Sequence, residues 1–134
     1  ARLIYLGVAH HHPNEAPRRL VIDIGGGSTE CILGEGFDPL VTDSLRMGCV
    51  GYSREYFPGG VLSREGMRAA RLAAGVELQS IERGYRAAGW DCCIGSSGTI
   101  LAVDAILRDM SGQAWGFSPA QNTTLASPKE NDMT

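Results

Sequence analysis

Residues 20–30 read Leu-Val-Ile-Asp-Ile-Gly-Gly-Gly-Ser-Thr-Glu, and this stretch decides the predicted fold. An apolar segment rich in β-branched residues, typical of a buried strand, runs directly into three glycines, two hydroxyl side chains and a carboxylate. Glycines accept positive φ angles and carry no Cβ, so consecutive backbone amides can converge on an anion. The order of residue types therefore predicts a strand that ends in a phosphate-binding turn.

The polar side chains around this turn indicate what it binds. Ser28 and Thr29 supply hydroxyl donors. Asp23 and Glu30 flank the turn with carboxylates suited to a hydrated divalent cation. A purely structural alternative is a hairpin on a Gly-Gly pair whose aspartate bonds its own turn. No lysine follows the glycines, which excludes the Walker pattern, and the apolar run 31–33 favours a second strand over the helix of a dinucleotide site.

A second glycine- and serine-rich loop follows further along the chain. Residues 92–94 resemble a short buried strand, residues 95–99 read Gly-Ser-Ser-Gly-Thr, and residues 100–107 carry an apolar helical pattern. A turn from a strand into a helix N-terminus suits an anion, because the first helical amides have no internal partner. Thr99 is equally suited to a simple N-cap.

Composition narrows the function classes. The chain has 134 residues, 43% of them hydrophobic, and no apolar run as long as a membrane helix. A formal charge of −3 argues against bulk electrostatic attraction to nucleic acid or to anionic lipid. The four cysteines lack metal-ligand spacing, so we expect buried free thiols and a cytoplasmic protein.

The remaining pattern predicts the secondary structure. Three strands of an antiparallel meander are expected at residues 19–24, 29–34 and 40–47. The turn between the second and third strands is expected at Asp38 and Pro39. Ser63 is a candidate N-cap for a long helix that ends near residue 89. Its core-facing stripe is predicted at positions 67, 70, 74, 78, 81 and 85. Residues 10–14 are predicted to form a loop, and propensity alone makes residues 1–8 a strand.

Four segments together resemble the exopolyphosphatase/guanosine-pentaphosphate phosphohydrolase (Ppx/GppA) family. They are residues 23–30, 46–50, 56–60 and 95–99, in the order that the family has them. The resemblance runs from Ala1 to about residue 117 and implies the ribonuclease H-like, actin-like ATPase fold. The expected α/β structure is one partial lobe, a mixed β-sheet in the order β-β-β-α-β-α flanked by helices. The resemblance also implies a helix, not a strand, at residues 1–8.

The resemblance further implies a domain organisation. Residues 1–18 would be a connecting helix and loop, and residues 19–117 an incomplete second, C-terminal lobe of the phosphatase domain. The family's first phosphate loop and its presumed catalytic-base glutamate are not in this sequence, so we expect an excised and inactive piece. Its expected partners are the N-terminal lobe and, for the full-length protein, a second copy in a homodimer. Residues 118–134, rich in Ser, Thr, Asn and Pro, are predicted to be a disordered tail.

The implied chemistry is hydrolysis of a terminal phosphoanhydride of inorganic polyphosphate or guanosine pentaphosphate, which releases orthophosphate with Mg²⁺ or another divalent cation. The metal would be held by Asp23 and Glu30, and Glu30 would also orient the attacking water. The substrate phosphates would be bound by Gly25, Gly26, Gly27, Ser28, Thr29, Arg46, Gly95, Ser96, Ser97, Gly98 and Thr99. Two alternatives stay open: a nucleotide-dependent kinase or ATPase of the same fold, and a non-catalytic sensor of polyphosphate or alarmone.

Overall fold

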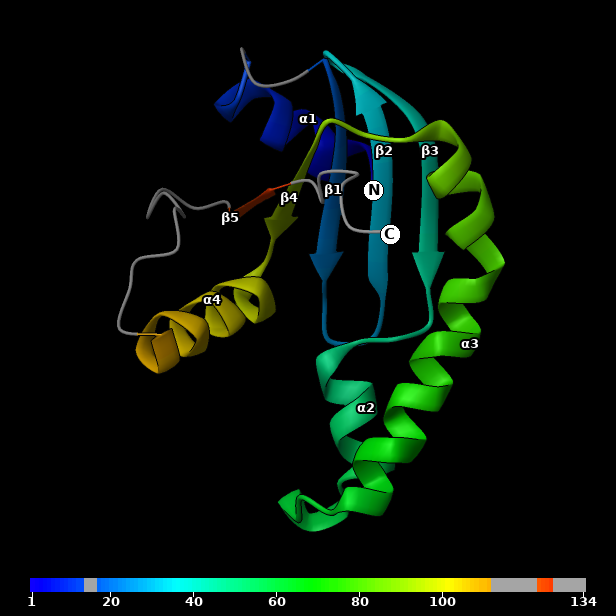
Figure 1. Cartoon of the computed structure of the whole chain (residues 1–134), viewed down its shortest axis with the longest axis vertical. Helices are drawn as coiled ribbons and strands as arrows, with labels where there is room; N and C mark the ends of the chain where they lie inside the picture. The colour runs from blue at the N-terminus through cyan, green and yellow to red at the C-terminus, as the bar shows by residue number, and fades with distance from the viewer. Residues whose placement is uncertain (14–16, 112–122, 127–134) are drawn as a thin grey trace, which may run out of the picture.

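A computed structural model of the chain describes residues 1–13, 17–111 and 123–126. It contains one five-stranded sheet with helices on both faces (Figure 1). The helices are α1 (Arg2–His11), α2 (Cys49–Tyr56), α3 (Arg64–Ala88) and α4 (Gly98–Ser111), with a short 3₁₀ turn at Pro58–Gly60. The strands are β1 (Arg18–Ile24), β2 (Thr29–Glu35), β3 (Asp38–Leu45), β4 (Cys92–Ser96) and β5 (Thr123–Ala126). After the first helix, the elements of the predicted order β-β-β-α-β-α are present, and the structure adds the short helix α2 before α3 and strand β5 after α4.

The strand order across the sheet is β3-β2-β1-β4-β5. The first three strands form the predicted antiparallel meander. Strand β4 returns beside β1 and runs parallel to it, because α3 carries the chain back across the sheet. The carboxyl ends of β1 and β4 therefore lie at the same edge of the sheet, where Figure 1 shows both arrowheads. Open α/β sheets bind ligands at this edge.

Each face of the sheet has its own core. Helix α1 packs Tyr5, Val8 and Ala9 onto one face, against Val21, Ile32 and Ile94. The Tyr5 ring lies so close to Gly34 that a Cβ there would overlap it, which explains the glycine inside β2. Helix α3 covers the other face, where the Tyr85 hydroxyl donates to the Cys31 carbonyl at 2.7 Å.

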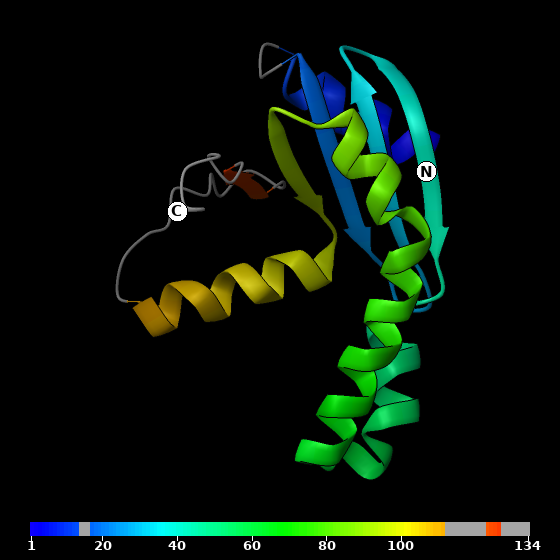
Figure 2. The ribbon, with the colours of Figure 1, turned by 45° about the vertical axis from the view of Figure 1, so that its right-hand side comes forward.

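The predicted core stripe of α3 is right only in part. Ser63 caps the helix as predicted, accepting from the Gly66 amide at 3.0 Å. Ala70 and Tyr85 are buried, whereas Met67 is 49% and Leu78 41% exposed. A helix of 25 residues is about 38 Å long, while a strand of 8 residues spans about 26 Å. The first half of α3 consequently extends past the sheet beside α2 (Figures 1 and 2).

Three local predictions are corrected. His10 and His11 form the last turn of α1 rather than a loop, although the helix itself was expected from the family resemblance. The turn after β2 lies at Gly36, which has φ 56°, and not at Asp38 and Pro39, which belong to β3. Proline is tolerated there because β3 is an edge strand. Strand β5 uses four residues of the predicted tail and pairs with β4, and the rest of 118–134 lies outside the described residues.

Candidate functional site

A row of polar side chains crosses four strands at the carboxyl end of β1. Asp23 pairs with Glu30 on β2 and with Ser96 on β4. Glu30 pairs in turn with Ser44 on β3. Paired residues on neighbouring strands project from the same face, with Cβ atoms about 5 Å apart. The sheet therefore presents two carboxylates side by side with a serine on each flank.

Hydrogen bonds fix one oxygen of Glu30. Its Oε1 accepts from the Ser28 hydroxyl at 2.8 Å and from the Ser44 hydroxyl at 3.0 Å. Within the described part of the chain, no hydrogen bond is recorded to the other oxygen, Oε2. Ser44 was missed at the sequence level, because only the pairing of β2 with β3 places it beside Glu30.

The pKa of the Asp23 carboxyl group is shifted both by burial and by the neighbouring Glu30. Partial burial raises its pKa above the usual value, and the negative charge of Glu30 raises the pKa further. A divalent cation placed between the two groups would relieve this repulsion, so the donor set fits Mg²⁺. Among the described residues no three His, Cys, Asp or Glu side chains form a metal cluster. Two carboxylates suit a site that shares the ion with water and substrate phosphates.

The triple-glycine turn is shaped by α2. The Gly25 amide donates to the Ser28 carbonyl at 2.8 Å and closes the turn. The Cys49 amide donates to the Gly25 carbonyl, and the Val50 and Gly51 amides donate to the Gly26 carbonyl, at 2.9 to 3.0 Å. The first turn of α2 thus holds the carbonyl side of the loop.

The glycines do not use the backbone freedom that was expected of them. None of the three has a positive φ angle, so the turn forms without the left-handed backbone that glycine allows. Gly26 and Gly27 are exposed, and the recorded hydrogen bonds of the described residues leave their two amides unused. Both amides are available to an anion.

Gly48 is the residue that sets the close approach. A Cβ on Gly48 would lie 2.5 Å from the Gly26 carbonyl carbon and from the Gly27 nitrogen. A Cβ atom essentially never makes a non-bonded contact this short, so only glycine lets the α2 N-terminus reach the loop. The residues quoted in the family resemblance include Gly48, but nothing in the sequence showed which backbone it meets.

Two of the proposed phosphate ligands have structural roles instead. Thr29 is 3% exposed and donates its hydroxyl to the Met47 carbonyl at 2.7 Å, which ties β2 to the loop before α2. Gly95 is buried, and a Cβ there would lie 2.5 Å from Cγ2 of Ile100. Gly95 therefore permits α4 to pack on β4.

The second loop offers serines at the start of α4. Ser96 belongs to the polar row, and Ser97 has φ 127°, a strained conformation for a residue other than glycine. Ser97 caps the helix, since its Oγ accepts from the Ile100 amide at 3.4 Å. The N-cap alternative for Thr99 is therefore wrong: Thr99 lies inside the first turn of α4, after the exposed Gly98.

Arg46 faces a different part of the surface. It lines a groove of about 490 Å³ between α2 and α3 together with Tyr52, Tyr56 and Glu77. Its backbone amide donates to Oε2 of Glu77 at 3.0 Å. Arg46 thus lines this groove, and its recorded contact is with Glu77 and not with Asp23 or Glu30.

Residues 1–123 match the description "Ppx/GppA phosphatase family". The chain belongs to the Ppx/GppA phosphatase family. It is 45% identical over 107 residues to a guanosine-5'-triphosphate,3'-diphosphate pyrophosphatase of Photobacterium profundum, covering 80% of this chain and 21% of the relative. A relative from Haemophilus influenzae is also 45% identical over 107 residues, and the match covers 33% of that relative's length.

Solved structures of Ppx/GppA proteins share this fold. An Aquifex aeolicus Ppx/GppA phosphatase superposes with a TM-score of 0.67 at 27% identity, over 82% of this chain and 35% of that one. A Cytophaga hutchinsonii exopolyphosphatase superposes with a TM-score of 0.65 at 27% identity, and the match covers 83% of this chain and 36% of that one. The predicted actin-like, ribonuclease H-like lobe is confirmed. This chain spans between a fifth and about a third of the relatives it matches.

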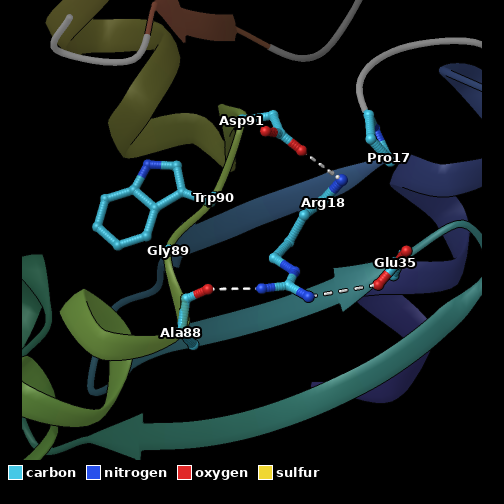
Figure 3. A pocket seen from close by; sticks show the side chains of 7 residues that line it. All are labelled: Pro17, Arg18, Glu35, Ala88, Gly89, Trp90 and Asp91. Atoms are coloured by element: carbon cyan, nitrogen blue, oxygen red, sulfur yellow. Dashed lines mark hydrogen bonds and ion pairs between the residues drawn. The ribbon is translucent and has the colours of Figure 1, made fainter. Parts of the chain in front are cut away.

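This Ppx/GppA lobe has a second hollow at the opposite end of β1, of about 390 Å³ (Figure 3). Arg18 lines this hollow between Glu35, Ala88 and Asp91 (Figure 3). The Arg18 side chain donates to the Ala88 carbonyl at 2.6 Å and lies 3.6 Å from the Glu35 carboxylate, and its backbone amide donates to Asp91 at 2.9 Å. These contacts hold the end of α3 against β1 and β2, so this hollow has the contacts of a structural brace.

Two further observations concern the setting of the Ppx/GppA lobe. No helix in the described ranges has the length and apolar character needed to cross a membrane. The four cysteines, all within the described ranges, form no disulfide. Cys31 and Cys93 are buried, but Cys49 is exposed, so the prediction that all four thiols are buried is wrong. Burial raises the pKa of the Cys31 and Cys93 thiols to about 11, which keeps both protonated near neutral pH.

Proposed function

We propose that this chain is part of a phosphoanhydride hydrolase that releases terminal orthophosphate from inorganic polyphosphate, from guanosine pentaphosphate, or from both. The observation that carries the proposal is the pair Asp23 and Glu30, side by side at the carboxyl end of β1 and next to an exposed glycine turn. The relatives named as an exopolyphosphatase and as a pyrophosphatase of a guanosine nucleotide support the same reaction class.

The two carboxylates would hold Mg²⁺ or another divalent cation. Burial raises the pKa of Asp23 and the charge of Glu30 raises it further, and a bound cation would remove both costs of ionising the pair. When bound, the ion would neutralise charge on the phosphoryl oxygens of the anhydride. Asp23 and Glu30 are also the ligand types that a hard cation prefers.

The chain's own groups would supply the rest of the chemistry. The amides of Gly26 and Gly27 and the hydroxyls of Ser28 and Ser96 would bind the transferring phosphoryl group. Such positioned donors act where charge develops in the transition state, and phosphoryl transfer needs little else from a protein. Glu30, with one oxygen held by serines, would use the other to orient the attacking water.

The rest of the site would come from outside this chain. Because the chain spans at most about a third of its relatives, we place it in the second lobe of a larger enzyme whose first lobe supplies the opposite wall and the catalytic base. We propose a homodimer for that complete enzyme. The four cysteines of this chain form no disulfide, which fits a reducing compartment, and we place the enzyme in the cytoplasm.

The test is phosphate release by the complete enzyme, meaning the protein that joins this lobe to the first one. Long-chain polyphosphate, guanosine pentaphosphate and ATP are compared in the presence of Mg²⁺, with and without chelator. Release from either of the first two, abolished by chelation, supports the proposal. Preferential turnover of ATP would identify a kinase or ATPase, and tight binding of polyphosphate without release would identify a sensor.

The isolated chain gives a second test. With one wall of the cleft present, its phosphate release should be indistinguishable from buffer. Rapid turnover by the purified chain would contradict the two-wall arrangement while leaving the reaction class intact.

A further inference from the structure

The hairpin between β2 and β3 contains a β-bulge whose position matters for the site. Next to the turn, Glu35 pairs with Asp38 and Gly34 with Pro39. One step further, Leu33 pairs with Val41, so Leu40 is an extra residue on β3. A bulge of this kind shifts the pairing of every later residue by one position.

The shift decides which side chain stands beside Glu30. If the register of the turn continued without the bulge, Asp43 would lie opposite Glu30 and would add a third carboxylate to the row. With the bulge, Asp43 pairs with Cys31 and projects from the other face, while Ser44 pairs with Glu30. A hydrogen-bond donor thereby takes the place of a like charge.

We propose that Ser44, brought opposite Glu30 by the bulge at Leu40, is a positioning residue that fixes the Glu30 carboxylate for phosphoanhydride hydrolysis. The proposal rests on the function proposed above. Ser44 donates to Oε1 at 3.0 Å and Ser28 donates to the same oxygen at 2.8 Å. Because the two donors come from different elements, β3 and the glycine turn, they determine the orientation of the carboxylate plane.

As a consequence, the two oxygens of Glu30 have different roles: Oε1 holds the carboxylate in place, and Oε2 faces the reaction. Oε1 is occupied by two hydroxyl groups, and Oε2 carries no hydrogen bond recorded among the described residues. A free glutamate side chain samples several rotamers, and a misplacement of about 1 Å can cost a hundredfold in rate. Ser44 keeps Oε2 aimed at the water or the cation without touching either.

The experiment compares three variants of the complete enzyme. Ser44→Ala removes the hydroxyl, Ser44→Thr retains one, and Thr42→Ala is the matched control. Thr42 lies two residues away on the same face of β3, is exposed, and pairs with Ile32 instead of Glu30. We expect Ser44→Ala to lower kcat about tenfold with KM changed less than about twofold, since a hydrogen bond to a charged group is lost. Ser44→Thr and Thr42→Ala should stay within about twofold of the parent.

A double-mutant cycle separates positioning from stability. In a Glu30→Gln background the Ser44→Ala substitution should cause no further loss of kcat, because Ser44 acts only through Glu30. An equal tenfold loss in both backgrounds would overturn the proposal, as would a kcat for Ser44→Ala that matches Thr42→Ala. If the parent enzyme releases no phosphate at all, the proposed function has failed, and the Ser44 proposal fails with it.

Discussion

Charged side chains lie at both ends of β1, but their contacts differ: those at the amino end have partners, and those at the carboxyl end are like charges side by side. At the amino end, Arg18 meets the Glu35 carboxylate, the Ala88 carbonyl and Asp91, so each charge has a partner (Figure 3). At the carboxyl end, Asp23 and Glu30 stand side by side with the same sign. One strand therefore joins an end where the charged side chains have hydrogen-bond or ion-pair partners to an end where two like charges repel.

The difference separates stability from function. The hydrogen bond from Arg18 to the Ala88 carbonyl holds the end of α3 to the sheet and stabilises the fold. A like-charged pair beside unused amides raises the energy of the fold, and such costs are characteristic of sites that a ligand completes. The following substitutions test this contrast, beginning with the largest expected effect.

Glu30→Gln in the complete enzyme should lower kcat about a hundredfold or more, since a group that acts on the transition state is lost. The control is Glu35→Gln at the other end of the same strand, which removes only an exposed ion pair and should leave kcat within about twofold. Both are measured by phosphate release with polyphosphate or guanosine pentaphosphate. Equal rates for the two variants would remove Glu30 from the site.

Gly48→Ala should destabilise the protein by about 1–3 kcal/mol, because its Cβ would overlap the backbone between Gly26 and Gly27. Gly27→Ala is the control, since a Cβ there meets nothing within 4 Å and the φ angle is not positive. Denaturant unfolding measures both. If Gly27→Ala keeps full stability but loses activity, the loss reports on the approach of a ligand to the loop.

Arg18→Ala should lower the free energy of unfolding by about 1 kcal/mol while kcat stays unchanged. The Ala88 carbonyl loses its donor, whereas the exposed ion pair with Glu35 contributes little. Arg86→Ala breaks an exposed pair with Glu82 within α3 and should cost less than about 0.5 kcal/mol. A large loss of kcat in Arg18→Ala would contradict the assignment of this end of β1 to structure.

Asp23→Asn should produce the smallest effect on stability, and in the opposite direction. The folded-state pKa of Asp23 lies above its unfolded value, so the folded protein holds the proton more tightly. Its stability therefore falls as the pH rises from the unfolded-state pKa through the folded-state pKa. The variant should therefore melt at a slightly higher temperature than the parent at pH 7, without added metal. Below about pH 3 the two melting temperatures should coincide.

Much of the fold was predictable because its signals are local. The meander, the Ser63 cap and the helix that follows depend on residues close together in the chain. The stripe of α3 was over-extended, since periodicity does not reveal how far the sheet reaches. The predicted core position Met67 is half exposed for that reason.

The site was predictable in its residue types and less so in its contacts. Asp23, Glu30 and Ser28 come together as expected, because they flank a single turn. Thr29, Gly95 and Arg46 were assigned to phosphate and have other neighbours, because a hydroxyl or a glycine in a loop fits packing and binding equally well. Their roles depend on Met47, Ile100 and Glu77, which lie up to 31 positions away.

The amino-acid sequence by itself determined the order of the elements, the glycine turn after β1 and the two acidic residues beside it, because these depend on neighbours in the chain. Only the tertiary structure decided that Ser44 faces Glu30, that Gly48 supports the loop and that Ser96 completes the row. The physical reason is register. Pairing between strands carries contacts across long stretches of chain, and one extra residue in β3 changes which side chain meets the site.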